Sequence, residues 1–201
     1  MSSRPLSEDE YAAIVSRLAA DGRRRDRLLV VLGCATGFRI TELLSLTVGQ
    51  VWNGHDVARE VTVARRHLKG GRSAHCRAVH ARRVPLAEPA RAAIRDFLAT
   101  LGPNPPPERH LFTTSRSGER PLHRAQAHRI LIGIVEGCGF DATRISTHTL
   151  RKTFVARIWR ASGHDLIKTQ RIVGHTSPLT TARYLETDQD DLDQLVRSLA
   201  A

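Results

Sequence analysis

Residues 57–86 carry a strand pattern, whereas the sequence on both sides of this stretch has helical periodicity. Valines stand at positions 57, 61 and 63 and again at 79 and 84, and Lys69-Gly70-Gly71-Arg72 lies between the two groups. β-Branched residues at this spacing favour strands, and a Gly-Gly pair favours a hairpin turn. We therefore expect a mainly helical α+β fold that contains one small antiparallel sheet.

Capping and periodicity predict the helices. Ser7 and Glu10 have the spacing of a capping box, which predicts a helix that continues to about Ala20. The apolar run 26–35 predicts a buried helix. The segment 102–107 contains four prolines and predicts a loop. Further helices are expected over residues 39–46, 87–101, 122–136, 147–161, 164–173, 178–185 and 189–199.

The charge of the chain indicates the class of its partners. Lys and Arg number 31 against 20 Asp and Glu, which gives a formal net charge of +11. An excess of this sign favours polyanions, nucleic acid first and an anionic membrane surface second. No apolar run reaches the roughly 20 residues of a membrane span, and no signal region is present at the N-terminus. We expect a cytoplasmic, nucleoid-associated protein with no membrane partner.

The cysteines do not indicate a metal site or a disulfide framework. Their number, three, is odd, and no Cys-x-x-Cys occurs. His75, Cys76 and His80 lack a second ligand pair at zinc-site spacing. We therefore expect no metal and no cofactor.

Five segments carry residues suited to chemistry on a phosphodiester. Metal-free strand transfer needs cations around the phosphate, a nucleophile and a general acid for the leaving alkoxide. Two arginines, a lysine or histidine acid and a hydroxyl nucleophile meet this need. The chain offers them in the order Arg39 with Glu42, Lys69, His148 with Arg151, His175 and Tyr184. The i, i+3 spacing of His148 and Arg151 places them on one helix face.

These segments resemble the tyrosine recombinase, or phage integrase, family. The resemblance rests on Ala-Thr-Gly-x-Arg-x-x-Glu-Leu at 35–43, Lys-Gly-Gly at 69–71, His-x-Leu-Arg-Lys-Thr-Phe at 148–154 and Gly-His-Thr-Ser-Pro-x-Thr-Thr-x-x-Tyr at 174–184. It runs from about residue 6 to 186. No single motif is specific, but the ordered set is. It implies the tyrosine recombinase catalytic-domain fold and site-specific recombination, that is, integration, excision or inversion.

The resemblance also implies a role for each matching residue. Arg39 and Arg151 would clamp the non-bridging phosphate oxygens, and Lys69 would protonate the 5′-hydroxyl leaving group. His148 would assist proton transfer around the nucleophile, and His175 would donate a hydrogen bond to the phosphate. Glu42 would orient the site. Tyr184 would be the nucleophile, and its attack would give a 3′-phosphotyrosine. The remaining arginines are interpreted as phosphate contacts or solvated surface.

Domain organisation and assembly follow from the same resemblance. Because the matching region begins almost at Met1, we expect a single catalytic domain over 1–201 without an N-terminal core-binding domain; the chain is either a fragment or a minimal member. The family works as a homo-tetramer on two DNA duplexes, through a Holliday junction, and accessory DNA-bending proteins are left open. An apolar stripe within 189–199 suits docking onto a neighbouring protomer or packing on its own core.

Two other functions remain open from the sequence. A type IB topoisomerase shares the arginine, lysine, histidine and tyrosine chemistry but relaxes supercoils without exchanging strands. A DNA-binding relic would keep the fold without catalysis. Each candidate residue also has an ordinary structural interpretation, for example an Arg39–Glu42 pair on a helix surface, but the complete ordered set favours the recombinase.

Overall fold

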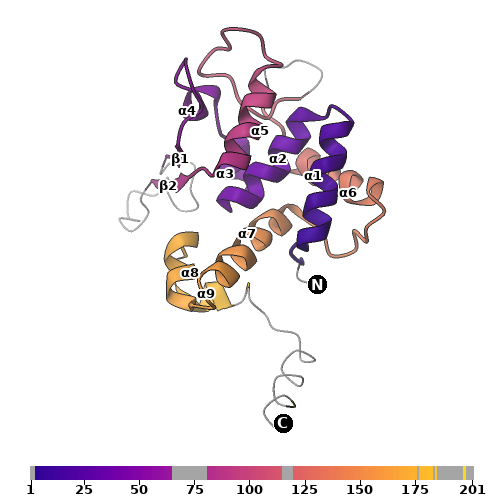
Figure 1. Ribbon diagram of the computed structural model, residues 1–201, viewed down its shortest axis with the longest axis vertical. Coiled ribbons are helices and arrows are strands. Elements are labelled where there is room, and N and C mark those ends of the chain that lie inside the picture. The colour runs from indigo at the N-terminus through magenta and orange to yellow at the C-terminus, as the bar shows by residue number, and fades with distance from the viewer. Residues whose placement is uncertain are drawn as a thin grey trace. The chain divides into compact units, whose positions relative to one another are not determined.

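The computed structural model describes residues 3–64, 81–114, 120–175, 177–182, 184 and 197. The chain divides into two compact units, Met1–Phe154 and Val155–Ala201, and each is considered by itself. In the described part of both units helices dominate, and the strands form one small sheet, as the sequence predicts (Figure 1).

Helix α1, Glu8–Ala20, begins at the expected capping box. The Ser7 hydroxyl accepts a hydrogen bond from the Glu10 amide at 3.1 Å, and the Glu10 carboxylate accepts one from the Ser7 amide at 2.8 Å. Arg4 then pairs with the same carboxylate at 2.7 Å. Ile14 and Leu18 are buried, which confirms the apolar face predicted from the periodicity. That face packs against the next helix.

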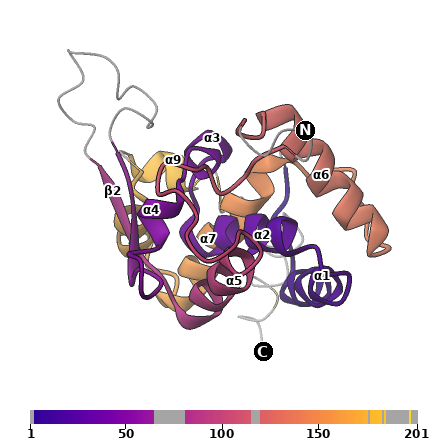
Figure 2. The ribbon, with the colours of Figure 1, turned by 90° about the horizontal axis from the view of Figure 1, so that it is seen from above.

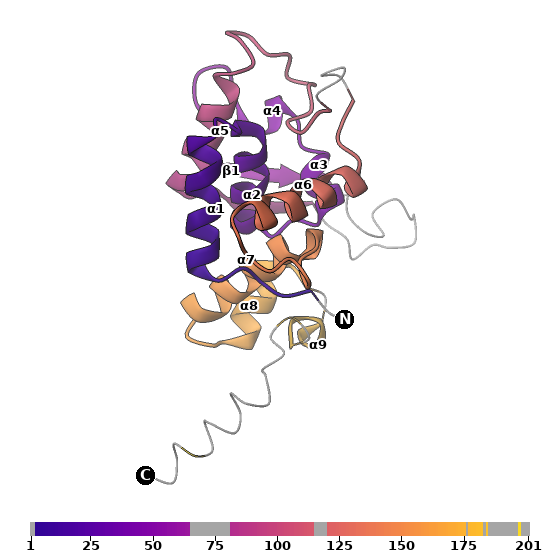
Figure 3. The ribbon, with the colours of Figure 1, turned by 90° about the vertical axis from the view of Figure 1, so that its right-hand side faces the viewer.

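Helix α2, Arg24–Thr36, lies at the centre of the first unit. It packs against α1 on one side and against α5, Glu88–Leu98, on another (Figure 3). Its apolar residues from Leu28 to Leu32 are all buried, as expected of a central helix. The helix ends at Gly37, which adopts the left-handed conformation at φ +58°. Glycine tolerates this conformation without steric cost.

Strands β1, Glu60–Val63, and β2, Arg82–Pro85, pair antiparallel, with Val61 opposite Val84. Figure 2 shows the two strands side by side at an edge of the first unit, next to α4. Helix α4, Val48–Val51, was not expected from the sequence. Gln50 at its end donates to the Thr62 carbonyl at 2.8 Å and so ties α4 to β1. The expected hairpin tip lies outside the described residues.

Three further helices complete the first unit. Helix α3, Ile40–Leu44, is shorter than the expected 39–46, and Arg39 stands at its N-cap. Helix α6, Arg124–Gly137, contacts α3 and begins two residues later than expected (Figure 3). Helix α7, Thr147–Ala161, has the predicted bounds. Its Leu150 packs where a side chain on Gly33 of α2 would stand, so these helices approach closely.

The second unit contains the end of α7 and two short helices that pack together, α8, Leu166–Val173, and α9, Pro178–Ala182 (Figure 1). Asp165 caps α8 by accepting from the Lys168 amide at 2.8 Å. Gly174 ends α8 in the left-handed conformation. The Ser177 hydroxyl accepts from the Leu179 amide at the start of α9. Most of the helix expected over 189–199 lies outside the described residues.

Among the residues that the structure describes, no helix combines the length and the apolar character that crossing a bilayer requires.

Candidate active site

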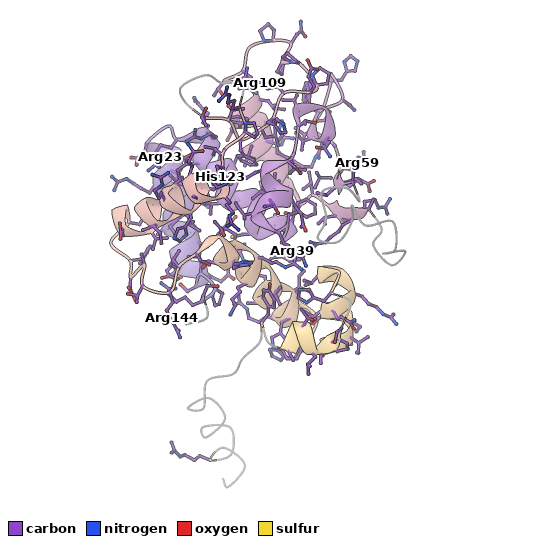
Figure 4. All side chains as sticks on the ribbon, turned by 180° about the vertical axis from the view of Figure 1, so that it is seen from behind. Arg23, Arg39, Arg59, Arg109, His123 and Arg144 are labelled. Atoms are coloured by element: carbon purple, nitrogen blue, oxygen red, sulfur yellow. The ribbon has the colours of Figure 1, made fainter. Side chains whose placement is uncertain are left out.

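Arg39 and Glu42 form the first part of the site, at the start of α3. The Glu42 carboxylate accepts from the Arg39 amide and from its guanidinium, each at 2.8 Å. The side chain of Glu42 is only 1% exposed, whereas that of Arg39 is 38% exposed. This is therefore not a pair on a helix surface: a buried carboxylate holds an arginine that still reaches solvent. Figure 4 labels Arg39 on this part of the first unit.

The Gly37 carbonyl connects two further arginines to this segment. Arg151, buried on α7, donates to the Gly37 oxygen through its terminal nitrogen. Arg82, at the start of β2, donates to the same oxygen at 3.3 Å and to the Thr36 carbonyl at 2.8 Å. The Arg82 guanidinium also lies over the Phe38 ring, 5.1 Å from its centroid. Arg39, Glu42, Arg82 and Arg151 are named here the arginine cluster.

Among the described residues that form the arginine cluster, three guanidinium groups stand with one carboxylate, that of Glu42, which is bonded to Arg39. The pKa of Arg82 is lowered to about 10: burial is the largest cause, and the positive charges of Arg151 and Arg39 also lower it, whereas the Glu42 carboxylate raises it. Arg82 therefore stays cationic at neutral pH. Concentrated positive charge away from water is costly unless an anion balances it. The cluster is thus suited to bind an anion such as a phosphate.

His148 stands one helical turn before Arg151 on α7, as the sequence predicts. Partial desolvation lowers the pKa of its imidazole, and the positive charges of Arg151, Arg39 and Lys152 lower it further. The residue remains exposed to solvent. Its lowered pKa makes the neutral ring, which can accept a proton, the main form near pH 7.

In the second unit, His175 is buried between the end of α8 and α9. Its Nδ1 lies 2.9 Å from the hydroxyl of Thr181, which is fully buried on α9. The Gln170 side chain donates to the His175 carbonyl at 3.0 Å and holds the backbone as well. The orientation of the ring is therefore fixed by a contact within its own unit.

Tyr184 follows α9 directly, and its amide donates to the Thr181 carbonyl at 2.9 Å. Its ring is 5.1 Å from the His175 ring between centroids, at an interplanar angle of 38°. The residue is half-buried, so its side chain keeps contact with solvent. The second unit thus brings the predicted nucleophile next to the predicted histidine, named here the histidine–tyrosine pair.

The structure brings Arg39, Glu42, His148 and Arg151 together in the first unit and His175 with Tyr184 in the second. Lys69 lies outside the described residues, as do His75, Cys76 and His80, which were considered as metal ligands.

Two residues of these groups were not singled out from the sequence. Arg82 was included among arginines interpreted as phosphate contacts or solvated surface, but it is half-buried and bonded to the backbone. Its position could have indicated a role, because Arg82 is the first residue of a strand that adjoins the expected hairpin. Thr181 lies within the segment 174–184 that resembles the family, but the resemblance implies no role for it.

Solved structures with this fold are known. The crystal structure of XerA recombinase superimposes with a TM-score of 0.73 at 22% identity, covering 100% of this chain and 66% of that one. A post-cleavage complex of the XerH site-specific recombinase with its difH substrate gives a TM-score of 0.70 at 22% identity, covering 100% of this chain and 54% of that one. The fold is therefore that of recombinase catalytic domains.

Sequence comparison shows the family. The phage integrase family matches residues 4–190, and the chain belongs to this family. A probable integrase/recombinase of Bacillus subtilis, YoeC, is 29% identical over 93% of this chain and 91% of its own length. The tyrosine recombinase XerD of Corynebacterium glutamicum is 33% identical over 96% of this chain but only 60% of its own length. The chain thus spans about three fifths of that XerD.

Proposed function

We propose that this chain is a site-specific DNA recombinase that cleaves and rejoins DNA strands through a bond between Tyr184 and a 3′-phosphate. The observation that carries the proposal is the arginine cluster. Arg82 and Arg151 are bonded to the carbonyls of one turn, and Arg39, two residues after it, is bonded to the buried Glu42 carboxylate, so three cations gather around one described anion. A protein stabilises such an excess best when an anion compensates it, and a phosphodiester is the anion on which the family's chemistry acts.

In the cleavage step, Arg39 and Arg151 hold the non-bridging phosphate oxygens and stabilise the charge that develops on them. The phenolate oxygen of Tyr184 attacks phosphorus, and the bond between phosphorus and the 5′-oxygen breaks. Guanidinium groups suit this task because they stay cationic and match phosphate geometry. Glu42 acts indirectly, by holding Arg39 in place.

Two proton transfers accompany this step. His148 accepts the proton that Tyr184 loses, a role that its lowered pKa supports. Lys69 donates a proton to the departing 5′-oxygen, and His175 donates a hydrogen bond to the phosphate. The phosphotyrosine keeps the energy of the broken ester, so a 5′-hydroxyl of another strand reverses the reaction without a further energy source.

A nicked suicide substrate tests the proposal. The nick lets the cleaved fragment diffuse away, so the covalent protein–DNA adduct accumulates and is seen on a denaturing gel. Wild type should form the adduct, Tyr184→Phe should not, and Tyr11→Phe should behave as wild type. Tyr11 is the matched control because the chain has only two tyrosines. An adduct that persists in Tyr184→Phe would mean that another residue is the nucleophile. The substrate is first selected from a library of genomic DNA by its binding to the protein.

The alternatives give different outcomes. Relaxation of a supercoiled plasmid without any recombination site would favour a type IB topoisomerase. DNA binding without any adduct would favour a non-catalytic relic of the family.

The assembly is a further part of the proposal. We propose that residues 1–201 act as a catalytic domain that forms a tetramer on two duplexes at the nucleoid. Accessory DNA-bending proteins are possible further partners of this assembly. Sedimentation of the Tyr184→Phe variant with the selected duplex tests this assembly, which predicts a complex of four chains and two duplexes.

A further inference from the structure

Arg82 differs from the arginine that follows it in the same strand. Arg82 directs its terminal nitrogens to the Thr36 and Gly37 carbonyls, and its Nε is buried without a hydrogen-bond partner among the described residues. The side chain of Arg83 is 69% exposed and pairs with Glu60 at 3.2 Å. Alternation along a strand explains the opposite directions of the two side chains. Of these two arginines, only Arg82 is directed towards the other members of the arginine cluster.

The peptide that Arg82 contacts is also the peptide that Arg151 contacts. The Gly37 oxygen accepts from both guanidinium groups, so Arg82 and Arg151 hold one carbonyl between them. Arg39 follows two residues later, after Phe38, whose ring lies beneath the Arg82 guanidinium. The geometry of both arginines expected to bind the phosphate therefore depends on this turn.

We propose that Arg82 is a positioning residue for strand transfer, which fixes the Thr36–Gly37 turn and through it places Arg39 and Arg151 against the phosphate. This inference rests on the proposed function. Arg82 acts through the turn rather than on the phosphate, because both its terminal nitrogens are bonded to carbonyls and its Nε is enclosed.

The charge of Arg82 is costly at this position. Its burial and its closeness to Arg151 and Arg39 disfavour the cationic form, as its lowered pKa shows. An apolar side chain would fill the space without this cost. The forked donor geometry of a guanidinium, which spans two successive carbonyls, gives a reason for an arginine here that packing alone does not give.

Single-turnover cleavage of the suicide substrate tests the inference. The variants are Arg82→Met and Arg82→Lys, and the matched control is Arg83→Met, which removes the same charge from the exposed face of the same strand. We expect Arg82→Met to slow adduct formation by about 100-fold, the size of effect that follows a small displacement of catalytic groups. The rate of Arg82→Lys should lie between those of Arg82→Met and wild type, since an ammonium group can donate hydrogen bonds but lacks the planar, forked donors of a guanidinium. Arg83→Met should form the adduct at a rate within about threefold of the wild-type rate, a much smaller change than the roughly 100-fold loss expected for Arg82→Met.

The amplitude of the cleavage reaction, that is, the fraction of protein molecules that form the adduct, distinguishes a positioning role from a role in the stability of the fold. A variant that is only less stable contains fewer active molecules, so its amplitude falls while the rate constant of the remaining molecules is kept. Misplaced arginines lower the rate constant and leave the amplitude. If Arg82→Met cleaves at the Arg83→Met rate, or loses amplitude alone, the inference is wrong. If Arg82→Met does not fold, Arg82→Lys decides by the same criteria.

A second measurement does not depend on cleavage. Sulfate resembles the phosphate and should raise the Tm of the free protein by binding the arginine cluster. We expect this rise to be smaller in Arg82→Met than in Arg83→Met, and equal rises would overturn the inference. If wild type forms no adduct that depends on Tyr184, the proposed function fails, and the sulfate comparison still decides whether Arg82 places the other arginines.

Discussion

The His175–Thr181 contact shows how one hydroxyl can set the chemistry of a ring. Among the described residues, the Thr181 hydroxyl has no partner except Nδ1 of His175. Which of the two groups donates depends on the tautomer of the ring, and the proposed role of His175 requires Nδ1 to accept from this hydroxyl. A neutral imidazole with an acceptor at Nδ1 carries its proton on Nε2. This is the tautomer that donates a hydrogen bond from Nε2, as the proposed role of His175 requires.

Thr181→Val should slow covalent adduct formation, because the valine keeps the shape of the side chain and removes the hydroxyl. We expect a slowdown of about two- to tenfold, the kinetic equivalent of a hydrogen bond worth about 0.5–1.5 kcal/mol. The single-turnover assay with the suicide substrate measures it. Thr180→Val is the matched control, since Thr180 is exposed on the same helix. Equal rates for the two variants would show that the Thr181 hydroxyl has no part in the reaction.

The lowered pKa of His148 predicts a dependence of stability on pH. Well above the ordinary histidine pKa of about 6.5 the imidazole is neutral in both the folded and the unfolded chain. As the pH falls through this value, the unfolded chain takes up a proton first, because desolvation, Arg151 and Arg39 oppose protonation in the folded chain. Wild type should therefore lose stability relative to His148→Gln as the pH falls.

Urea unfolding of both proteins from about pH 8 to about pH 5 measures this difference, which spans the ordinary histidine pKa. His128→Gln, on the exposed face of α6, is the histidine control. A free-energy difference between wild type and His148→Gln that stays constant over this range would contradict the prediction.

Residues with a known motif were predictable from the sequence, and residues defined by burial were not. Arg39, His148 and Arg151 are spaced along helices, so local geometry brings each near its partner. Arg82 has no such local pattern: its partners lie 45 and 46 positions earlier in the chain, and only the tertiary fold brings them together. Since arginine is usually solvated, the residue type alone did not indicate that Arg82 is half-buried and bonded to the backbone.

At the scale of the elements, the end of α2 matters most for the site. Gly37 stops the helix in the left-handed conformation and turns its carbonyl towards Arg82 and Arg151. A Cβ at this position would overlap the ring of Phe154. The turn is thus restricted twice, by backbone conformation and by close packing against α7.

Gly37→Ala should destabilise the protein by about 2–5 kcal/mol, because left-handed strain and overpacking add. Gly22→Ala is the control: Gly22 has φ +66°, but a Cβ there would meet no atom within 4 Å, so only the strain of about 1–2 kcal/mol applies. Urea denaturation of the two variants measures the difference. Equal losses would show that Phe154 moves aside without cost.

The same elements show what sequence patterns can and cannot predict. The long helices α1 and α2 were predictable because capping and periodicity act over many residues. Helix α4 has four residues, too few for a periodic pattern, although the capping pair Thr47 and Gln50 was a usable signal. The predicted ends of α3 and α6 differ from the observed ones by one to two residues, because tertiary packing decides where a helix ends.

At the scale of the whole molecule, positive charge is spread over the surface as well as gathered in the cluster. Figure 4 labels Arg59, Arg109 and Arg144, which come from separate segments of the first unit. None of the three forms a salt bridge with a carboxylate in the described part of the chain. Together with the net charge of +11, such cations favour contacts with a phosphate backbone that do not depend on base sequence.

Binding of DNA should therefore depend steeply on salt. Each phosphate contact releases counterions, so the logarithm of the affinity falls linearly with the logarithm of the salt concentration. If about six cations contact phosphates, the affinity for a random duplex falls by about 1,000-fold between roughly 50 and 200 mM salt. Fluorescence anisotropy with Tyr184→Phe measures this fall, since that variant excludes covalent adducts. A change below about tenfold would mean that few of the 31 basic residues meet the backbone, and that affinity comes instead from base contacts, which salt affects far less.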